Sequence, residues 1–474
     1  MSRQGIEREV DGDMPTIIDT IDQIAPVFFC VVIIFMAVVL LMEQHRKRQL
    51  AEVKYGSATT AHGIIFGKRG RRLAYSPTDA EGHVGVFSAS GTGKTAAVGI
   101  PTLRSWQGTS FVIDISGDIC RNCPQMPDKL VFEPDNRTTL PYNIFGAIDV
   151  LPDVADKYEA LEQLAFLLMP EPPQITENAR FFLTNGRKIL TSALIAFYGI
   201  GEDFIAICEK IVGSDWIDLF RAIDATGNKD AQMYINSFQG ASEQNTAGCK
   251  QSCDDAIKLF ATNGHIRSCI RRPRTGEKAV EPEQIEDHNL FVVVTEDKLA
   301  LYAPLLNIVT SQLMQYIGKR RISDKSSTIL LFLDEFGSLK IDSELVLDAV
   351  RRFRKRRCRL MLLTQNTVDL ELIYGKAATR AILSNLRYKE LLGGLGEPES
   401  QKYFSELIGY TIAQRKSTTS SSNSTSHTKA ESREWLIEPA DLDRQGKDTA
   451  LLLASDFEHG YIKLKKNFYF KNKR

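Results

Sequence analysis

The 474-residue sequence predicts an α/β fold with a parallel sheet, an inserted all-α domain and an N-terminal transmembrane helix. Three observations lead to this prediction. Short runs rich in Val, Ile and Leu alternate with helical stretches in the first and last thirds of the chain, which is typical of a parallel sheet covered on both faces. Residues 151–285 instead show long helical periods with almost no β-branched alternation. Residues 24–42 contain no charge and are long enough to cross a bilayer core.

The charges around 24–42 favour a retained membrane helix over two alternatives. A cleavable signal peptide has a basic region before its apolar stretch and a small-residue cleavage site after it, whereas residues 1–23 are acidic and no such site follows. A buried core helix rarely runs this far without a polar face. Residues 46–48 are Arg, Lys and Arg, and basic clusters stay on the cytoplasmic side. We therefore expect a single-pass anchor with an acidic tail outside the cytoplasm and the main domain inside.

The overall composition excludes few classes of protein. Lys+Arg and Asp+Glu both number 59, so a surface for nucleic acid would have to be local. The length suggests two or three domains, and eight scattered cysteines fit a reducing compartment. Cys120 and Cys123 have the spacing of a zinc or redox motif, but no second such pair or paired histidines follow at finger spacing. We therefore favour reduced thiols there over a metal site.

The remaining elements follow from position 43 in chain order. A charged juxtamembrane linker is expected at 43–75, the first part of the nucleotide-binding α/β domain at 76–150, the all-α domain at 151–285 and the second part at 286–474. Strands are expected at 83–87, 111–115, 130–132, 290–294, 329–333, 359–363, 391–393, 449–454 and 460–465. Helices are expected at 94–105, 157–169, 179–198, 243–263, 300–319, 343–356 and 397–408. The Ser/Thr-rich stretch 416–428 is predicted to be a mobile loop.

A glycine-rich loop between a predicted strand and a predicted helix carries the strongest functional signal. Such a P-loop needs small residues so that backbone N–H groups can surround phosphates, a lysine that reaches the β and γ oxygens, and a hydroxyl that holds Mg²⁺. Ser88 stands where the usual pattern has its first glycine, so the strict pattern is missed by one residue. An accidental turn is the alternative, and the flanking strand and helix argue against it. The predicted nucleotide-binding residues are Ser90, Gly91, Thr92, Gly93, Lys94 and Thr95.

A second signal is the apolar strand 329–333, which ends in Asp334 and Glu335. The carboxyl end of such a strand meets the nucleotide, so Asp334 is predicted to hold Mg²⁺ together with Thr95. Glu335 is predicted to polarise the attacking water. Alone, an apolar strand ending in two acids is a weak signal. Together with the P-loop it is strong, because a nucleotide hydrolase needs both halves.

Two further polar residues end predicted strands. Gln365 could sense the γ-phosphate or orient water, and an ordinary strand-end amide is an equally good interpretation from the residue alone. Asp114 could line the same site together with residues 117 and 118. Its role stays open.

The stretch 351–359 contains seven basic residues in nine. It closes an amphipathic helix, and a solvated helix end with cations suited to the helix dipole accounts for about half of them. The remainder are candidates for phosphate contacts, either with DNA or, as an arginine finger, with the ATP of a neighbouring subunit.

Together these residues resemble the type IV coupling proteins, the TraG/TraD class of conjugation and type IV secretion ATPases. The resemblance covers most of 83–474 in family order. It also rests on the sequences IPTL at 100–103, VIDISGD at 112–118, PYNIF at 141–145, EDKLA at 296–300, TQN at 364–366, LELIYG at 370–375 and GGLGEPESQKY at 393–403.

The resemblance implies a RecA-like motor domain interrupted by an all-α domain, working as a homo-hexamer in the bacterial inner membrane. It implies ATP and Mg²⁺ as cofactors, and the transfer of relaxase-bound single-stranded DNA or of protein substrates into a type IV secretion channel. It assigns Lys94 and Thr95 to phosphate and Mg²⁺, Asp334 to Mg²⁺, Glu335 to water, Gln365 to the γ-phosphate and Arg354 to the arginine finger.

The sequence departs from this family in two respects, and two other functions stay open. Many members have two membrane helices and some have a long C-terminal tail, whereas we expect one helix and no such tail. A double-stranded DNA translocase of the chromosome-segregation type would share the motor, but it usually has more membrane helices and a DNA-reading winged helix. A membrane scaffold that binds nucleotide without hydrolysis is disfavoured by Glu335 beside Asp334.

Overall fold

The computed structural model describes residue 36 and residues 53–172, 174–339, 341–421, 424–457 and 459–472. Residues from Val53 onward form one compact unit. The predicted tail 1–23 and membrane helix 24–42 fall outside the described residues, apart from Met36, and stay predictions. Within the described part of the chain, no helix is both long enough and apolar enough to span a bilayer.

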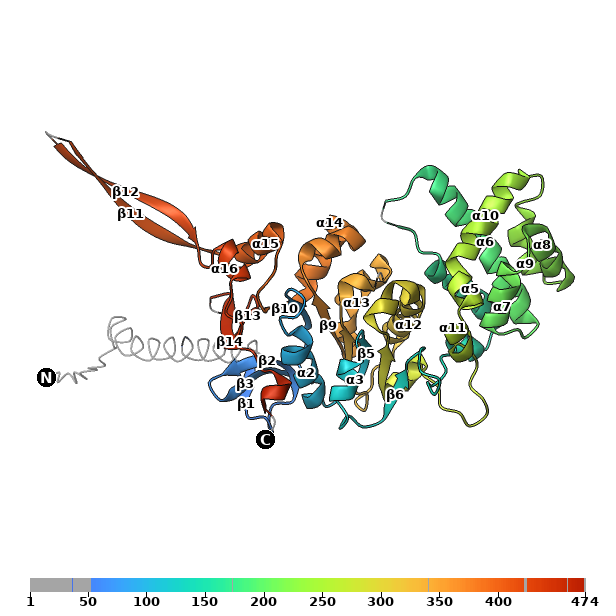
Figure 1. Ribbon diagram of the computed structural model, residues 1–474, viewed down its shortest axis with the longest axis horizontal. Coiled ribbons are helices and arrows are strands. Elements are labelled where there is room, and N and C mark those ends of the chain that lie inside the picture. Colours follow the sequence, from blue (N-terminus) through green and yellow to red (C-terminus); the bar gives the residue numbers. More distant parts are fainter. Residues whose placement is uncertain are drawn as a thin grey trace, which may run out of the picture. The chain divides into compact units, whose positions relative to one another are not determined.

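A twelve-stranded sheet forms the centre of this unit (Figure 1). Seven strands are parallel: β4 (His83–Phe87), β5 (Thr109–Asp114), β6 (Lys129–Phe132), β7 (Asn289–Val293), β8 (Ile329–Leu333), β9 (Cys358–Thr364) and β10 (Leu386–Leu391). Their spatial order is β10-β4-β9-β8-β5-β7-β6. This order places the strand before the P-loop, β4, next to the strand that ends before Gln365. The predicted α/β class with a large parallel sheet is confirmed.

Both faces of the parallel sheet are covered. In β8, Leu330 and Phe332 belong to one buried cluster, whereas Ile329, Leu331 and Leu333 belong to another. The first cluster includes residues of α2 (Ile100–Ser105) and α3 (Asp118–Asn122), and the second includes residues of α12 (Leu299–Lys319), α13 (Ser343–Arg352) and α14 (Thr367–Asn385). Strands buried on two sides need apolar residues at every position, which explains the continuous apolar runs in the sequence.

Five strands extend the sheet beyond β10 with antiparallel pairing. They are β13 (Thr449–Leu453), β14 (Tyr461–Lys465), β2 (Gly63–Arg69), β3 (Arg72–Pro77) and β1 (Lys54–Gly56). The predicted linker 43–75 is therefore wrong from position 54 onward, because β1, β2 and most of β3 are part of the sheet. Ile64, Ile65 and Phe66 are buried and hold β2 in place. The charges that suggested a linker gather in the exposed turn 69–72.

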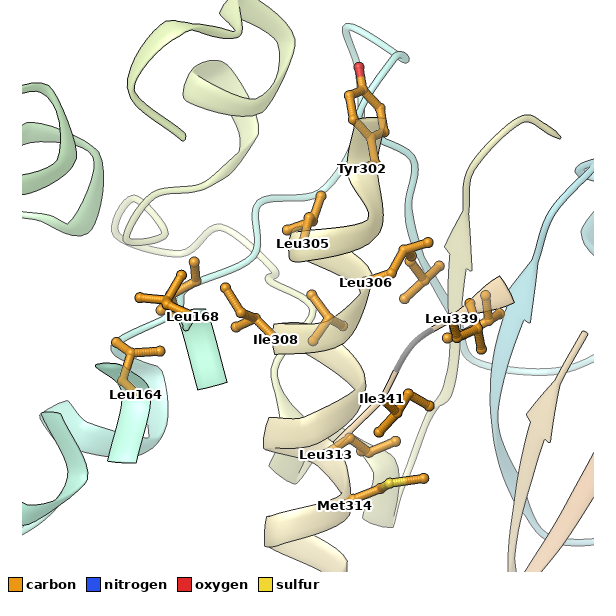
Figure 2. Close-up of a cluster of buried hydrophobic side chains, with 14 of the residues drawn as sticks. Leu164, Leu168, Tyr302, Leu305, Leu306, Ile308, Leu313, Met314, Leu339 and Ile341 are labelled. Atoms are coloured by element: carbon orange, nitrogen blue, oxygen red, sulfur yellow. The ribbon is translucent and has the colours of Figure 1, made fainter. Parts of the chain in front are cut away.

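The described residues of 151–285 form seven α-helices and no strand of the sheet. These are α5 (Val154–Leu168), α6 (Glu177–Gly199), α7 (Phe204–Val212), α8 (Trp216–Ala225), α9 (Lys229–Asn236), α10 (Glu243–Thr262) and α11 (Gly264–Cys269). Figure 2 shows Ile308 of α12 on the side of Leu164 and Leu168 of α5, with Leu306 on the opposite side of the helix near Leu339 and Ile341. Helix α12 therefore joins the helical insertion and the sheet into one continuous core.

Two expectations for the last third of the chain were wrong. Residues 416–421 and 424–428 were expected in a loop, but they belong to β11 (Tyr410–Ser421) and β12 (Ser424–Trp435), which pair in register as an antiparallel hairpin (Figure 1). This Ser/Thr-rich sequence lacks the alternation of apolar and polar residues that marks a strand. The strand expected at 391–393 ends at Leu391 and begins at Leu386. The charged residues at 387, 389 and 390 make 386–391 unlike the apolar sequences of the other parallel strands, so the start of this strand was missed.

Candidate nucleotide-binding site

The P-loop connects β4 to η1 (Lys94–Gly99), which continues directly into α2. Gly91 and Gly93 have φ angles of 74° and 100°, and such angles favour glycine because it has no Cβ. Lys94 is 5% exposed, and its Nζ donates a hydrogen bond to the carbonyl oxygen of Ser88 at 2.8 Å. The loop thus curls around the lysine amino group, as a phosphate-binding loop does.

The sheet order brings the two acids to this loop. Thr95 Oγ1 donates to Asp334 Oδ1 at 3.3 Å, although the two residues are 239 positions apart in the sequence. The Nζ of Lys94 lies 3.7 Å from Glu335 Oε1. The carboxyl ends of parallel strands form the usual ligand site of an open α/β sheet. The structure therefore brings together the four residues on which the prediction of hydrolysis depends.

Asp334 and Glu335 have different environments. Burial raises the pKa of Asp334 to about 7, and the negative charges of Glu335 and Asp114 act in the same direction, while Lys94 and Thr95 oppose them. Glu335 is 28% exposed, and its φ of 49° lies in the left-handed region. Left-handed backbone at a non-glycine residue costs free energy and is concentrated at functional sites. Here that conformation turns the chain immediately after Asp334.

Gln365 lies at the same edge of the sheet as the acids. It follows Thr364, the last residue of β9, and it is exposed. Glu335, Thr364, Gln365 and Asp369 line a common pocket of about 190 Å³. A water molecule held there would lie between a carboxylate and an amide, the two groups predicted to orient it.

The residues fit a magnesium ion of the kind that accompanies nucleotides. No group of three or more His, Cys, Asp or Glu side chains in the described part of the chain could form a complete protein cage for a metal. Mg²⁺ usually keeps several waters and is bound by one or two carboxylates together with phosphate oxygens. Asp334 and the hydroxyl of Thr95 offer that limited protein share.

The contacts of Asp114 and of the cysteine pair indicate structural roles. Asp114 is fully buried, and its carboxylate accepts hydrogen bonds from the backbone N–H groups of Ser116 and Cys120. This fixes the loop after β5 beside Asp334, which gives Asp114 a supporting position. Cys123 is buried in the apolar core, where burial raises the pKa of its thiol to about 11. Both cysteines are free thiols.

Arg354 lies at the opposite edge of the sheet. It belongs to η5 (Phe353–Arg356), directly before β9, whereas Gln365 directly follows β9. Seven strand residues at 3.3 Å each separate the two by roughly 20 Å. The Nε of Arg354 lies 3.3 Å from Glu81 Oε2, and both side chains are 59% exposed. Within one chain, Arg354 is therefore not part of the P-loop site.

Several residues of the basic stretch make contacts inside the chain. Arg359 is 2% exposed and donates to the carbonyl oxygens of Pro77 and Gly82. Arg356 Nη1 donates to the carbonyl oxygen of Arg320 at 2.7 Å. The predicted helix 343–356 consists of α13 followed by η5. Arg351, Arg352, Arg354, Lys355 and Arg357 remain exposed.

Two hydrogen bonds that support the P-loop were not predicted from the sequence. The N–H of Ala89 donates to the carbonyl oxygen of Gly394 at 2.9 Å. Lys466 Nζ donates to the carbonyl oxygen of Thr92, also at 2.9 Å. The glycines at 393, 394 and 396 could have signalled a close backbone approach, because a Cβ on Gly394 would lie 3.1 Å from that of Ala89. Nothing in the sequence around Lys466 pointed to the P-loop.

Comparisons with known proteins identify the family and the fold. The family model described as type IV secretory system conjugative DNA transfer matches residues 42–474. Protein VirD4 of Rhizobium rhizogenes is 22% identical over 437 residues, which cover 83% of this chain and 62% of that protein. Protein VirD4 of Agrobacterium fabrum is 22% identical over 379 residues, covering 74% and 54%. The chain thus spans less than two thirds of the length of these relatives.

Solved structures show the same fold. The unbound bacterial conjugative coupling protein TrwBdeltaN70 aligns with a TM-score of 0.66 at 19% identity, over 86% of this chain and 89% of that chain. The plasmid coupling protein TrwB in complex with ADP and Mg²⁺ aligns with a TM-score of 0.63 at 18% identity, over 81% and 85%. TrwB has also been solved with a non-hydrolysable ATP analogue.

Proposed function

The chain belongs to the type IV coupling proteins, the family of conjugative DNA transfer in type IV secretory systems, and we propose that it is an ATP-driven motor of that transfer. Its cargo would be relaxase-bound single-stranded DNA, protein substrates or both, delivered to a type IV secretion channel. We further propose that residues 24–42 anchor it in the bacterial inner membrane, with the compact unit in the cytoplasm.

One observation carries the proposal of hydrolysis. Lys94 and Thr95 lie against Asp334 and Glu335 at the edge where the parallel strands end. Lys94 would bind the β- and γ-phosphates, and Glu335 would orient a water for in-line attack on the γ-phosphate. Bound Mg²⁺, held by Thr95 and Asp334, would neutralise charge on the phosphate oxygens. The products would be ADP and phosphate.

ATP and Mg²⁺ are the proposed cofactors for two reasons. The donor set of one hydroxyl and one carboxylate suits Mg²⁺ that is shared with phosphates. TrwB, which shares the fold, has been solved with ADP and Mg²⁺ and with an ATP analogue.

We propose that Arg354 completes the site of a neighbouring copy in a homo-hexamer. Its place at the opposite edge from Lys94 excludes a role in its own P-loop site, whereas a ring of copies could set one subunit's Arg354 beside the next subunit's ATP. Gln365, which follows β9, would contact the γ-phosphate, whereas Arg354 precedes that strand. A movement of β9 would then link the two neighbouring sites.

Replacing the P-loop lysine tests the motor. Lys94→Ala should fold and bind DNA normally, because this side chain contacts the loop itself and not the apolar core. ATP hydrolysis in the presence of DNA, and substrate transfer in cells, should both be lost. Lys376→Ala, which removes an exposed lysine on α14, is the matched control and should keep both activities. Normal transfer by Lys94→Ala would disprove the motor, and transfer without hydrolysis by the wild type would favour a nucleotide-binding scaffold.

A further inference from the structure

The segment 466–472 follows β14 and lies at the same edge of the sheet as the P-loop. β13 is antiparallel to β10, and β14 is antiparallel to β13. β14 therefore runs in the same direction as β10 and β4, which are parallel to each other. The carboxyl ends of these strands meet where open α/β sheets bind their ligands. The topology thus delivers the residues after β14 to the nucleotide edge.

Lys466 connects this segment to the P-loop. Its side chain is 8% exposed, and its Nζ donates to the carbonyl oxygen of Thr92 at 2.9 Å. Its backbone N–H donates to the carbonyl oxygen of Asp448 at 2.8 Å. A largely buried lysine that is held by the sheet at its backbone and by the P-loop at its tip restrains the shape of that loop.

Aromatic rings follow directly. The ring of Phe468 covers the α-carbon of Gly93 so closely that a Cβ there would lie 2.6 Å from its Cε1. Phe470 stacks on Phe468 with ring centroids 5.3 Å apart and is 49% exposed. The guanidinium of Arg104, on α2, lies 4.9 Å from the ring centroid of Tyr469. The segment therefore presents a supported aromatic surface beside the glycine that precedes the P-loop lysine.

The acids determine which way a nucleotide would lie across this edge. Glu335 and Gln365 follow β8 and β9, on one side of β4, whereas β10, β13 and β14 lie on its other side. A phosphate chain with its γ end beside Glu335 directs its nucleoside away from β8 and β9. That direction leads to the side of β14, where Phe468 and Phe470 lie.

We propose that Phe468 and Phe470 form a stacking surface for the nucleobase, and that Lys466 is a positioning residue that holds the P-loop at Thr92. The inference rests on the proposed function, since it requires a nucleotide at Lys94. Every base has a π-face, so stacking is tolerant of base identity. This surface therefore favours nucleotides over base-free polyphosphates and does not select adenine over guanine.

Calorimetric titration of the full chain with Mg²⁺–ADP and with Mg²⁺–pyrophosphate tests the stacking surface. Phe470→Ala and the conservative Phe468→Leu should each weaken ADP binding by about tenfold, the loss of one base–aromatic contact, and leave pyrophosphate binding unchanged. Phe181→Ala is the matched control, because Phe181 on α6 is similarly exposed at 45%, and it should change neither. Unchanged ADP binding in both variants, or an equal loss of ADP and pyrophosphate, would overturn the stacking surface.

Lys466→Met keeps the apolar stem and removes the donor to Thr92. It should weaken ADP and pyrophosphate to the same extent, because both ligands need the restrained P-loop, and unchanged binding of both would overturn the positioning role. Failure of the proposed function gives a different result. In that case the wild type would bind neither ligand, or Lys94→Ala would bind both as tightly as the wild type.

Discussion

The two edges of the parallel sheet differ in charge and in burial. At the carboxyl edge, Asp334 is 6% exposed and lies against Thr95, next to a buried lysine. At the amino edge, Arg354 and Glu81 form an ion pair in which both side chains are 59% exposed. An exposed pair contributes at most about 1 kcal/mol, so Arg354 can exchange its partner at little cost. The carboxyl ends of the strands thus enclose a candidate ligand site within the chain, whereas the amino ends carry an exposed arginine.

The largest expected effect tests whether the two edges complete one site between subunits. Arg354→Ala should bind ATP almost normally and hydrolyse it about 10³–10⁵-fold more slowly, as loss of an arginine finger does. Mixed oligomers of Arg354→Ala and Lys94→Ala should regain part of the ATPase rate, because some interfaces then pair an intact Lys94 with an intact Arg354. Arg351→Ala, at an exposed arginine near the same helix end, is the control. A wild-type rate of ATP hydrolysis by Arg354→Ala in the assembled oligomer would show that Arg354 has no catalytic role and belongs only to a solvated helix end.

The second prediction concerns chemistry at the carboxyl edge alone. Glu335→Gln should lower the hydrolysis rate by about 10²–10⁴-fold, the usual contribution of a general base, while the Kd for Mg²⁺–ADP stays unchanged. Asp369→Asn removes the charge of another carboxylate lining the same pocket and should have little effect on the rate. Equal losses in the two variants would show that the charge of the pocket matters, and not the position of Glu335 after β8.

The third prediction separates structure from chemistry at the amino edge. Arg359 donates to the carbonyl oxygens of Pro77 and Gly82 and to Ser76 Oγ, and its loss leaves acceptors buried without a donor. Arg359→Met should lower the free energy of unfolding by on the order of 3 kcal/mol without changing the Kd for Mg²⁺–ADP. Arg357→Met, at an exposed position, should change unfolding by less than about 1 kcal/mol. Urea denaturation measures both, and equal stabilities would contradict the buried role of Arg359.

The smallest effect is a pH dependence at the start of β4. Burial lowers the pKa of His83 to about 4, and the positive charges of Arg359 and Arg354 add to this, whereas the unfolded side chain titrates at 6.5. The folded protein thus resists protonation, so stability that is complete above pH 6.5 is lost as pH falls toward 4. The loss reaches about 1.4 kcal/mol at pH 5.5. His83→Asn keeps an acceptor for the N–H of Leu360. In urea denaturation between pH 4 and 6.5, this variant should lose the dependence of unfolding free energy on pH. An unchanged dependence would show that another group causes it.

Local sequence predicted those parts of the fold in which both faces of a strand are buried. The run at 329–333 is apolar at every position and the run at 83–87 is apolar after His83, so β4 and β8 occupy the expected residues. Strands that contain charged or Ser/Thr-rich stretches were missed or misplaced. Lys389 and Glu390 interrupt β10, and the Ser/Thr-rich sequence of β11 and β12 has no apolar face. Their strand conformation depends on pairing partners, which composition alone does not reveal.

The residues of the candidate site also differ in whether a local sequence pattern predicts them. The P-loop and the acid pair have local patterns, because a glycine-rich turn and a strand ending in acids each fulfil a local requirement. The contacts of Lys466 with Thr92 and of Phe468 with Gly93 have no such pattern. They arise only because β14 runs in the same direction as β4. Arg354 is distant from Lys94 because Arg354 precedes β9, whereas Lys94 follows β4, which runs parallel to β9.

The sheet order also has a consequence for how the protein is made. β4 lies between β9 and β10, and the N–H of Leu360 bonds to His83 across 277 positions of sequence. At about 5–20 residues per second, a ribosome needs on the order of tens of seconds to synthesise that interval. Until then the strand before the P-loop has neither neighbour, and pairings this distant in sequence form slowly. A nascent chain that does not yet contain β9 and β10 therefore lacks a formed nucleotide site, and we expect ATP turnover to begin only after these two strands have been synthesised.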